Sequence, residues 1–251
     1  MTATRVFDMV DTIGTNKRLY DAVHIVDAIS HTEVTLSDIS LSCRNASSNL
    51  LDYAIRRGEY VALVKTDHFA ECMACLCLQK IGAIPIIIDN DLKAEDYINI
   101  MNGHAIRYMF VNDDMAVASF RLIAPQMPHL VQLFTYEKHP QLPSLCEMAL
   151  KANNDTQQIA LLDHRTSIAT TDDVALCLLS HSLATTDFTH KQLLKAISDK
   201  ESAASETQLA QFLAHLHEHA PFQVNGCSMF ATEKKKKRER SRLTTLLLSV
   251  F

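Results

Sequence analysis

Apolar runs of strand length alternate with helical patterns along most of the chain. The runs are short, rich in Val, Ile and Leu, and bounded by polar turns, whereas the helical segments repeat apolar residues every three or four positions. Strands are therefore predicted at 22–29, 31–39, 59–67, 84–91, 105–114, 129–137 and 173–181. Helices are predicted at 41–58, 68–83, 92–104, 114–124, 190–198 and 206–220.

Local signals set the ends of these elements. In 31–39, Val34, Leu36 and Ile39 are expected on alternating faces of a strand. Gly58 supplies a C-terminal stop for the helix before it. Residues 151–172 are polar and irregular, which predicts a surface connection. Strands that alternate with helices in this way predict an α/β fold with a largely parallel sheet flanked by helices.

Composition and charge narrow the class of protein. The chain has 251 residues, of which 47% are hydrophobic and 21% charged, and this argues against wholesale disorder. A net charge of -5 gives no overall attraction to nucleic acid. No apolar run reaches the about 18 residues of a membrane-spanning helix. The seven cysteines are an odd number and lie mostly in apolar runs, which fits reduced thiols in a soluble cytoplasmic protein.

The order of several segments carries a resemblance to a known family. VTLSDI, NLLDYAIRRG, EYVALVKTD and FAECMACLCLQKIGAIPIIIDND follow one another in the first part of the chain. Together they resemble the start of the adenylate-forming (AMP-binding) superfamily, which includes acyl-CoA synthetases and the adenylation domains of non-ribosomal peptide synthetases. The match covers roughly residues 20–115 and resumes at 172–197. It implies the fold of the N-terminal subdomain of these ligases. Each element alone is common, so a generic doubly wound domain is the alternative.

The segment DDVALCLLSHSLATTDFTHKQLLKAIS tests the resemblance most closely. The family has here a strand, a Ser/Thr/Gly-rich loop ending Gly-x-Pro-Lys-Gly, and a Thr-His or Ser-His pair that opens a helix. This chain has the strand and the pair Thr189-His190, but only HSLATTDF lies between them. Ser182, Thr185 and Thr186 are the expected remnants of the loop hydroxyls that contact the triphosphate of ATP. The loop glycines, proline and lysine are absent, and Asp187 adds negative charge, so the loop is predicted not to hold phosphate.

The resemblance also defines the cofactors and partners to expect. Full-length relatives use ATP and Mg to convert a carboxylic acid to an acyl-adenylate, which they transfer to CoA or to a carrier-protein thiol. Nothing after residue 200 matches the family's adenine, ribose or lid motifs. The resulting hypothesis is a truncated, inactive ligase that binds no cofactor alone and has no assigned catalytic residue. An active ligase completed by a second chain, and a non-catalytic α/β interaction module, are the alternatives.

Three other groups of residues have competing interpretations. Cys72, Cys75 and Cys77 form C-x2-C-x-C, which is better explained by core positions of an apolar helix than by a metal site. The histidines of HLHEH are better explained by a solvated helix end than by metal binding. Cys177, with a histidine such as His190, could suggest a hydrolase, but a thiol in an apolar strand is expected to be inert.

The end of the chain differs in composition from the rest. We divide the sequence into a partial ligase subdomain at 1–200, an additional helix at 201–230 and a basic tail at 231–251. Lys234–Arg242 could direct the protein to the nucleus or contact nucleic acid, although the overall charge makes nucleic acid a poor partner. A disordered, solvated tail and a tail produced by a shifted reading frame or retained intron are the alternatives.

Overall fold

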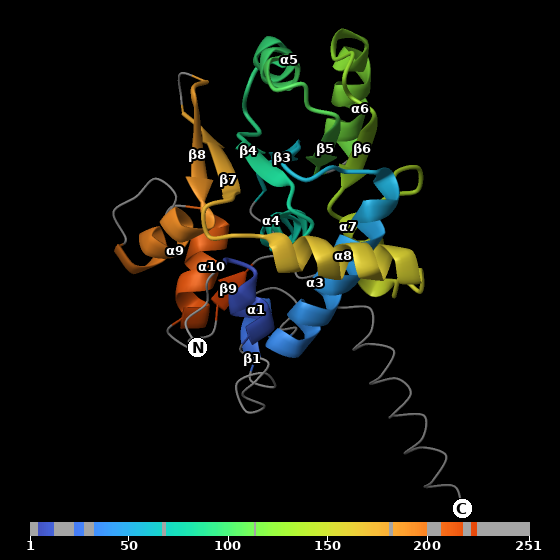
Figure 1. Cartoon of the computed structure of the whole chain (residues 1–251). Coiled ribbons are helices and arrows are strands. Elements are labelled where there is room, and N and C mark those ends of the chain that lie inside the picture. The colour runs from blue at the N-terminus through green and yellow to red at the C-terminus, as the bar shows by residue number, and fades with distance from the viewer. Residues whose placement is uncertain are drawn as a thin grey trace, which may run out of the picture.

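A six-stranded sheet forms the centre of the molecule (Figure 1). The computed structural model describes residues 5–12, 23–27, 33–66, 69–112, 114–180, 183–199, 207–217 and 222–224. The strand order is β6-β5-β3-β4-β7-β8, in which β6 to β7 are parallel and only β8 is antiparallel to its neighbour. The strands are β3 (Tyr60–Val64), β4 (Ile84–Ile88), β5 (Tyr108–Val111), β6 (Gln132–Thr135), β7 (Val174–Leu179) and β8 (Thr185–Thr189). The predicted α/β fold with a largely parallel sheet is confirmed.

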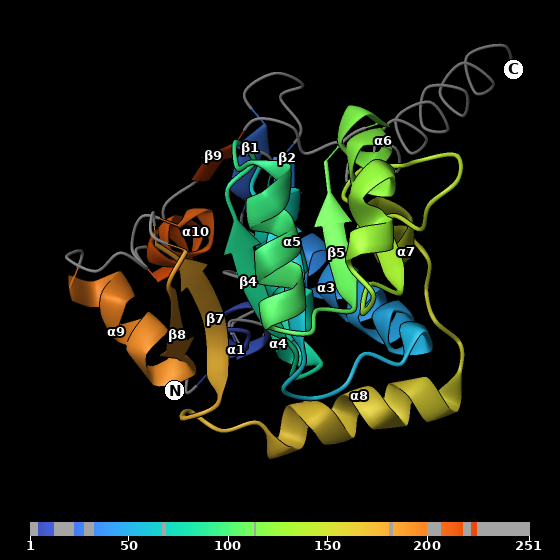
Figure 2. The ribbon, with the colours of Figure 1, turned by 90° about the horizontal axis from the view of Figure 1, so that it is seen from above.

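Helices cover the two faces of this sheet unequally. Those on one face, called the α5/α6 face, are α5 (Ala94–Gly103) and α6 (Asp114–Ile123), as Figure 2 shows from above. Those on the other face, called the α4 face, include α3 (Leu36–Leu50), α4 (Ala70–Lys80), α7 (Leu145–Leu150) and α8 (Thr156–Ile168). The two faces form separate hydrophobic clusters, because alternate residues of each strand point to opposite sides.

The α4 face holds the larger core. Every residue of α4 is buried, including Glu71, Gln79 and Lys80, because other helices surround it on the side away from the sheet. This burial confirms that the cysteines of α4 are core residues. The helices α9 (His190–Asp199) and α10 (Gln208–His217) extend the same core. None of the described helices has the length and apolarity needed to cross a membrane.

A small second sheet joins distant parts of the chain. Its strands are β1 (Val23–Asp27), β2 (Glu33–Thr35) and β9 (Phe222–Val224), in the order β2-β1-β9. β1 pairs with β2 antiparallel and with β9 parallel. The short helix α1 (Asp8–Thr12) precedes this sheet and contacts α3 and α10. The basic tail at 231–251, with Lys234–Arg242, lies outside the described residues, so its assignment stays a prediction.

Helix α3 corrects two predictions. The strand predicted at 31–39 ends at Thr35, because Thr35 and Asp38 form a capping box that starts the helix at Leu36. The helix also ends before Gly58. After the short 3-10 helix η2 (Leu51–Tyr53), Ala54 takes a left-handed conformation with φ of 57° and closes the turn. Our prediction placed this stop at Gly58 because the sequence rule favours glycine at such a position.

The polar segment 151–172 was predicted as an irregular connection, and this is wrong. Thirteen of its residues form α8, which Asp155 caps by accepting a hydrogen bond from the backbone N–H of Gln157. The segment shows little apolar periodicity because only Leu162 of this helix is buried. Arg165 also holds this helix in place, because its guanidinium donates to the carbonyl oxygens of Ile55 (2.8 Å) and Ile81 (3.0 Å).

Arg165 therefore satisfies carbonyl groups just beyond the ends of η2 and α4. Arg165→Met keeps the aliphatic length but removes both hydrogen bonds, and we expect it to lower the free energy of unfolding by about 2–3 kcal/mol. Urea denaturation followed by circular dichroism measures the loss. Arg57→Met is the matched control, because Arg57 pairs with Asp173 at the surface and should cost about 1 kcal/mol or less. Equal losses in the two variants would contradict the role given to Arg165.

Candidate functional site

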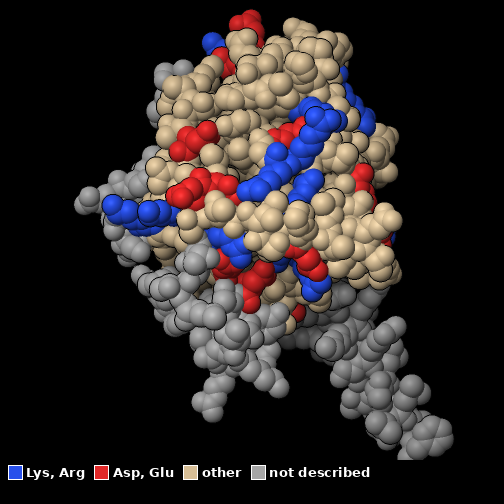
Figure 3. All heavy atoms as spheres, in the orientation of Figure 1, with Lys and Arg blue, Asp and Glu red and all other residues tan. Residues whose placement is uncertain are grey.

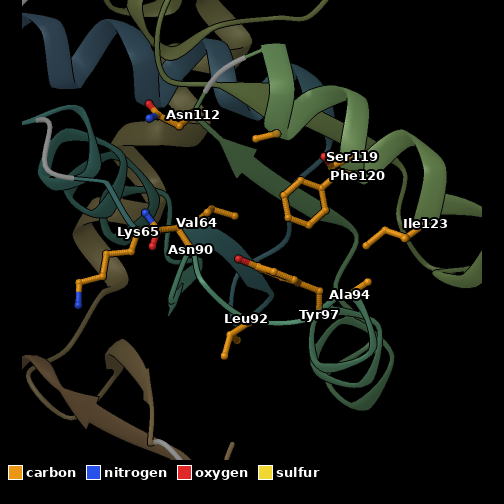
Figure 4. A pocket seen from close by; sticks show the side chains of 11 residues that line it. Val64, Lys65, Asn90, Leu92, Ala94, Tyr97, Asn112, Ser119, Phe120 and Ile123 are labelled. Atoms are coloured by element: carbon orange, nitrogen blue, oxygen red, sulfur yellow. The ribbon is translucent and has the colours of Figure 1, made fainter.

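A cavity lies at the carboxyl edge of the parallel sheet, where β3, β4 and β5 end. The chain leaves β3 toward α4 on one face, whereas it leaves β4 and β5 toward α5 and α6 on the other. A crevice opens at such a point of divergence, because the connections separate to opposite sides of the sheet. Here the crevice has a volume of about 400 Å³ and lies between α5 and α6 (Figure 4).

The walls of this cavity are largely apolar. Tyr97 and Phe120 reach into it from α5 and α6, with ring centroids 4.9 Å apart and ring planes at 89°. Val64, Leu92 and Ile123 complete the apolar surface. Such a surface can take an apolar or aromatic group of a small molecule.

Polar groups come from the residues that directly follow the strands. Lys65 follows β3, Asn90 lies just after β4, and Asn112 follows β5. The Lys65 Nζ atom lies 3.2 Å from Asp89 Oδ1, and both side chains are exposed. These amides and the ammonium group can donate hydrogen bonds to a ligand at the rim of the cavity. These residues were not among the predicted site residues, although Asn and Asp directly after buried parallel strands are the signal that could have identified them.

A hydrogen bond holds the side chain of Tyr97 in the wall of the cavity. Its hydroxyl donates to the carbonyl oxygen of Asp89 at 2.6 Å. Burial, followed by the charges of Asp91 and Asp89, raises the pKa of Tyr97 to about 12, so the phenol stays protonated at neutral pH. Among the described residues that line it, the cavity therefore offers neutral hydrogen-bonding groups and the Lys65 ammonium.

The connection between β7 and β8 is a tight turn that uses its own hydrogen-bonding groups. The backbone N–H of Ser180 donates to the Ala184 carbonyl (2.8 Å), and that of Leu183 donates to the Ser180 carbonyl (2.9 Å). The Ala184 N–H donates to the Ser180 hydroxyl at 3.2 Å. Leu183 has a φ of 61°, a left-handed conformation that a glycine would adopt without strain. These three amides already have partners inside the turn.

The predicted phosphate-loop hydroxyls lie mostly on a strand. Thr185 and Thr186 are exposed and belong to β8, where they pair with Leu179 and Leu178. Consecutive strand residues point to opposite faces, so these two hydroxyls do not converge on one ligand. Ser182 lies outside the described residues. The loop predicted over HSLATTDF is therefore shorter than expected, because its second half is a strand.

Asp187 and the helix after it also have local partners. The Asp187 carboxylate accepts a hydrogen bond from the Tyr60 hydroxyl at 2.9 Å. Burial, with the hydrogen bond and charge of Asp187, raises the pKa of the Cys177 thiol far above its usual range, in agreement with its prediction as an inert group. The predicted helix start at Thr189-His190 is confirmed. The Thr189 N–H donates to the Gln192 side-chain oxygen at 2.8 Å, and the Gln192 N–H donates to the Thr189 hydroxyl at 3.2 Å.

His190 has a structural partner in the N-terminal segment. Its Nδ1 atom accepts a hydrogen bond from the Val6 N–H at 3.2 Å, and its ring packs edge-on against Phe7. Burial lowers the pKa of His190 to about 4, so the imidazole is neutral at pH 7. Within the described ranges, no three His, Cys, Asp or Glu side chains are grouped closely enough to hold a metal ion.

Charges of both signs are interspersed on the surface. On the face shown in Figure 3, Lys and Arg side chains of the described part lie beside Asp and Glu side chains. Pairs such as Arg57 with Asp173 contribute to this pattern.

Solved structures with the same fold identify the architecture. No protein-family model and no curated protein sequence matches the chain. A long-chain-fatty-acid-CoA ligase from Archaeoglobus fulgidus is similar, with a TM-score of 0.69 and 14% identity over 94% of this chain and 50% of that one. The luciferase-like enzyme of the mealworm Zophobas morio gives 0.70 and 14%, over 94% and 56%. A benzoate CoA ligase from Burkholderia xenovorans gives 0.61 and 17%, over 78% and 36%.

The chain thus spans about half the length of the first of these proteins, and less than two thirds of the length of each of the three. At these identities the likeness concerns the backbone architecture. It includes the order of strands and helices that the motif series predicted. The chain has the fold of the N-terminal part of the adenylate-forming, AMP-binding enzymes.

Proposed function

We propose that this chain is a degenerate AMP-forming acid:CoA ligase or adenylation domain that does not activate an acid by itself. One observation carries the proposal: the β7–β8 turn, which corresponds to the phosphate loop in the resemblance, has its described backbone amides bonded within the turn. A triphosphate needs free amide donors and a nearby cation. This turn offers neither glycine nor lysine, and Asp187 follows it.

The residues present therefore do not fit the ATP and Mg that relatives of this fold use. Releasing the Ser180, Leu183 and Ala184 amides to a ligand would first break the hydrogen bonds that form the turn. Asp187 would add repulsion toward a polyanion. Under this proposal, a carboxylic acid, CoA and a carrier protein are substrates only of an assembly in which another polypeptide supplies the nucleotide site.

Isothermal titration of the purified chain with Mg-ATP tests the proposal. We expect affinity weaker than about 1 mM, because the described amides of the turn already have hydrogen-bond partners. A complete acyl-CoA ligase, titrated under the same conditions, is the positive control, and circular dichroism confirms that the chain is folded. Sub-millimolar binding that Thr185→Ala weakens would show that the proposal is wrong. So would exchange of labelled pyrophosphate into ATP by the chain alone.

A further inference from the structure

Two buried thiols face each other across the α3–α4 interface. Cys43 on α3 is 2% exposed and Cys77 on α4 is 0% exposed. Their sulfur atoms lie 3.7 Å apart. A disulfide bond is roughly 2.05 Å long. To form one, the two sulfur atoms must move closer together by less than the radius of a sulfur atom. The pair belongs neither to the cavity nor to the β7–β8 turn.

The two thiols are not equivalent. The Cys77 thiol donates to the Cys43 sulfur and also lies 3.6 Å from the Cys43 carbonyl oxygen. The hydrogen bond from Cys77, opposed by burial and assisted by the charge of Lys80, lowers the pKa of the Cys43 thiol. Burial, followed by the contact with Cys43, raises the pKa of Cys77. Cys43 is therefore the better nucleophile, whereas Cys77 stays protonated and donates the hydrogen bond.

A charged pair borders these thiols. The Lys80 ammonium contacts both carboxylate oxygens of Asp11, at 2.8 and 2.6 Å, and the Asp11 side chain is 33% exposed. Asp11 also accepts a hydrogen bond from Ser40 on α3. The charges of Lys80 and Asp11 both act on the Cys43 thiol, so this part-exposed pair is near the two sulfur atoms.

We propose that Cys43 and Cys77 are an oxidation site, at which hydrogen peroxide converts the thiol pair to an intramolecular disulfide that joins α3 to α4. In the first step the Cys43 thiolate attacks one peroxide oxygen, the O–O bond breaks, and a sulfenic acid forms with release of water after protonation. In the second step the Cys77 sulfur attacks the Cys43 sulfur, the S–O bond breaks, and a second water leaves. Two thiols are oxidised and one peroxide is reduced to two waters.

The cross-link would close a loop that contains β3. Residues 43 and 77 flank η2, β3 and the start of α4, so the disulfide ties together the elements that lead into the carboxyl edge of the sheet. Restricting this segment in the unfolded chain is expected to raise the midpoint of thermal unfolding by several degrees. The effect would require no change in the ligand-binding groups.

Peptide mapping of the full chain tests the proposal. The reduced protein is treated with hydrogen peroxide, blocked with N-ethylmaleimide in denaturant and digested with trypsin. Cys43 then lies in the peptide 19–44, whereas Cys72, Cys75 and Cys77 share the peptide 66–80. We expect these two peptides to be joined with loss of two hydrogens, and fragmentation of the joined species should place the bond at Cys77.

Serine variants separate this bond from other thiol reactions. Cys77→Ser should lower the yield of the joined peptides by at least about tenfold, whereas the matched controls Cys72→Ser and Cys75→Ser should keep it. The oxidised wild type should also unfold at a higher temperature than the reduced protein. Persistence of the joined peptides in Cys77→Ser would overturn the proposal. So would over-oxidation of Cys43 to the sulfinic acid without any cross-link in a folded wild type.

Discussion

Glu71→Gln is expected to stabilise the folded protein by about 3 kcal/mol at about pH 8 and to have little effect at about pH 4.5. The side chain of Glu71 lies inside the α4 face of the sheet and is only 2% exposed. One of its carboxylate oxygens accepts the backbone N–H of Thr66 at 2.9 Å. The amide oxygen of glutamine can accept the same bond without carrying a charge.

The sign of this effect follows from the protonation of the carboxyl group. Burial is the main cause that raises the pKa of Glu71 from 4.5 to about 7 in the folded protein. The folded chain therefore binds more protons than the unfolded chain between these pH values. The stability that depends on protonated Glu71 is fully present below about pH 4.5 and is lost as the pH rises through about 7. Glutamine removes this loss.

Urea unfolding at several pH values measures the prediction. Glu95→Gln, which changes an exposed carboxylate on α5, is the matched control and should shift stability by less than about 0.5 kcal/mol. His190 has the opposite dependence, since its lowered pKa destabilises the fold as the pH falls from 6.5 through about 4. Its contribution is common to all variants and cancels in the comparison. Equal pH profiles for wild type and Glu71→Gln would refute the role given to Glu71.

Asp11→Ala is expected to lower the free energy of unfolding by about 2–4 kcal/mol. The reason is that Lys80, whose side chain is 8% exposed, would lose the carboxylate that neutralises it. Burial lowers the pKa of Lys80, but nearby Cys43 and Asp11 raise it by more, so the ammonium is charged in the folded state. A buried charge without its partner is costly because neither water nor another ion replaces the lost interaction.

Replacing the other partner of the ion pair, Lys80, provides the control. Lys80→Met removes the ion pair of Asp11, but the Asp11 carboxylate keeps its hydrogen bond from Ser40 and, being 33% exposed, can be hydrated. Lys80→Met should therefore cost less than Asp11→Ala, by about 1 kcal/mol or more, in urea unfolding at neutral pH. The double variant should be more stable than Asp11→Ala alone. A larger loss for Lys80→Met would mean that packing of its aliphatic chain, rather than charge, dominates.

The sheet and most of its helices were predictable because their apolar patterns report burial directly. β3, β4 and β7 are continuous apolar runs, as strands covered on both faces must be. The helix α8 was missed because a helix with one buried residue lacks the periodicity that identifies helices. The end of α3 was missed because Ala54 adopts a conformation that sequence rules assign to glycine.

The site was less predictable than the fold. The missing glycines and lysine of the phosphate loop were visible in the sequence, but the β8 strand at Thr185–Thr189 was not. It depends on pairing with β7, which is a tertiary contact. The cavity forms because the connection after β3 leads to one face of the sheet and the connections after β4 and β5 lead to the other. Only the assembled sheet therefore brings Lys65, Asn90 and Asn112 to one edge.

The N-terminal residues of this fold bind to groups that are synthesised much later. Val6 donates to His190, and β1 pairs with β9 at Phe222. During translation, α1 can already contact α3 and Asp11 can pair with Lys80, whereas the Val6 N–H and the β9 edge of β1 still lack their partners. The N-terminal segment therefore completes its contacts only after His190 and the strand Phe222–Val224 have been synthesised. A nascent chain stalled before residue 190 is accordingly expected to be cleaved by proteases near Val6 more readily than the finished protein.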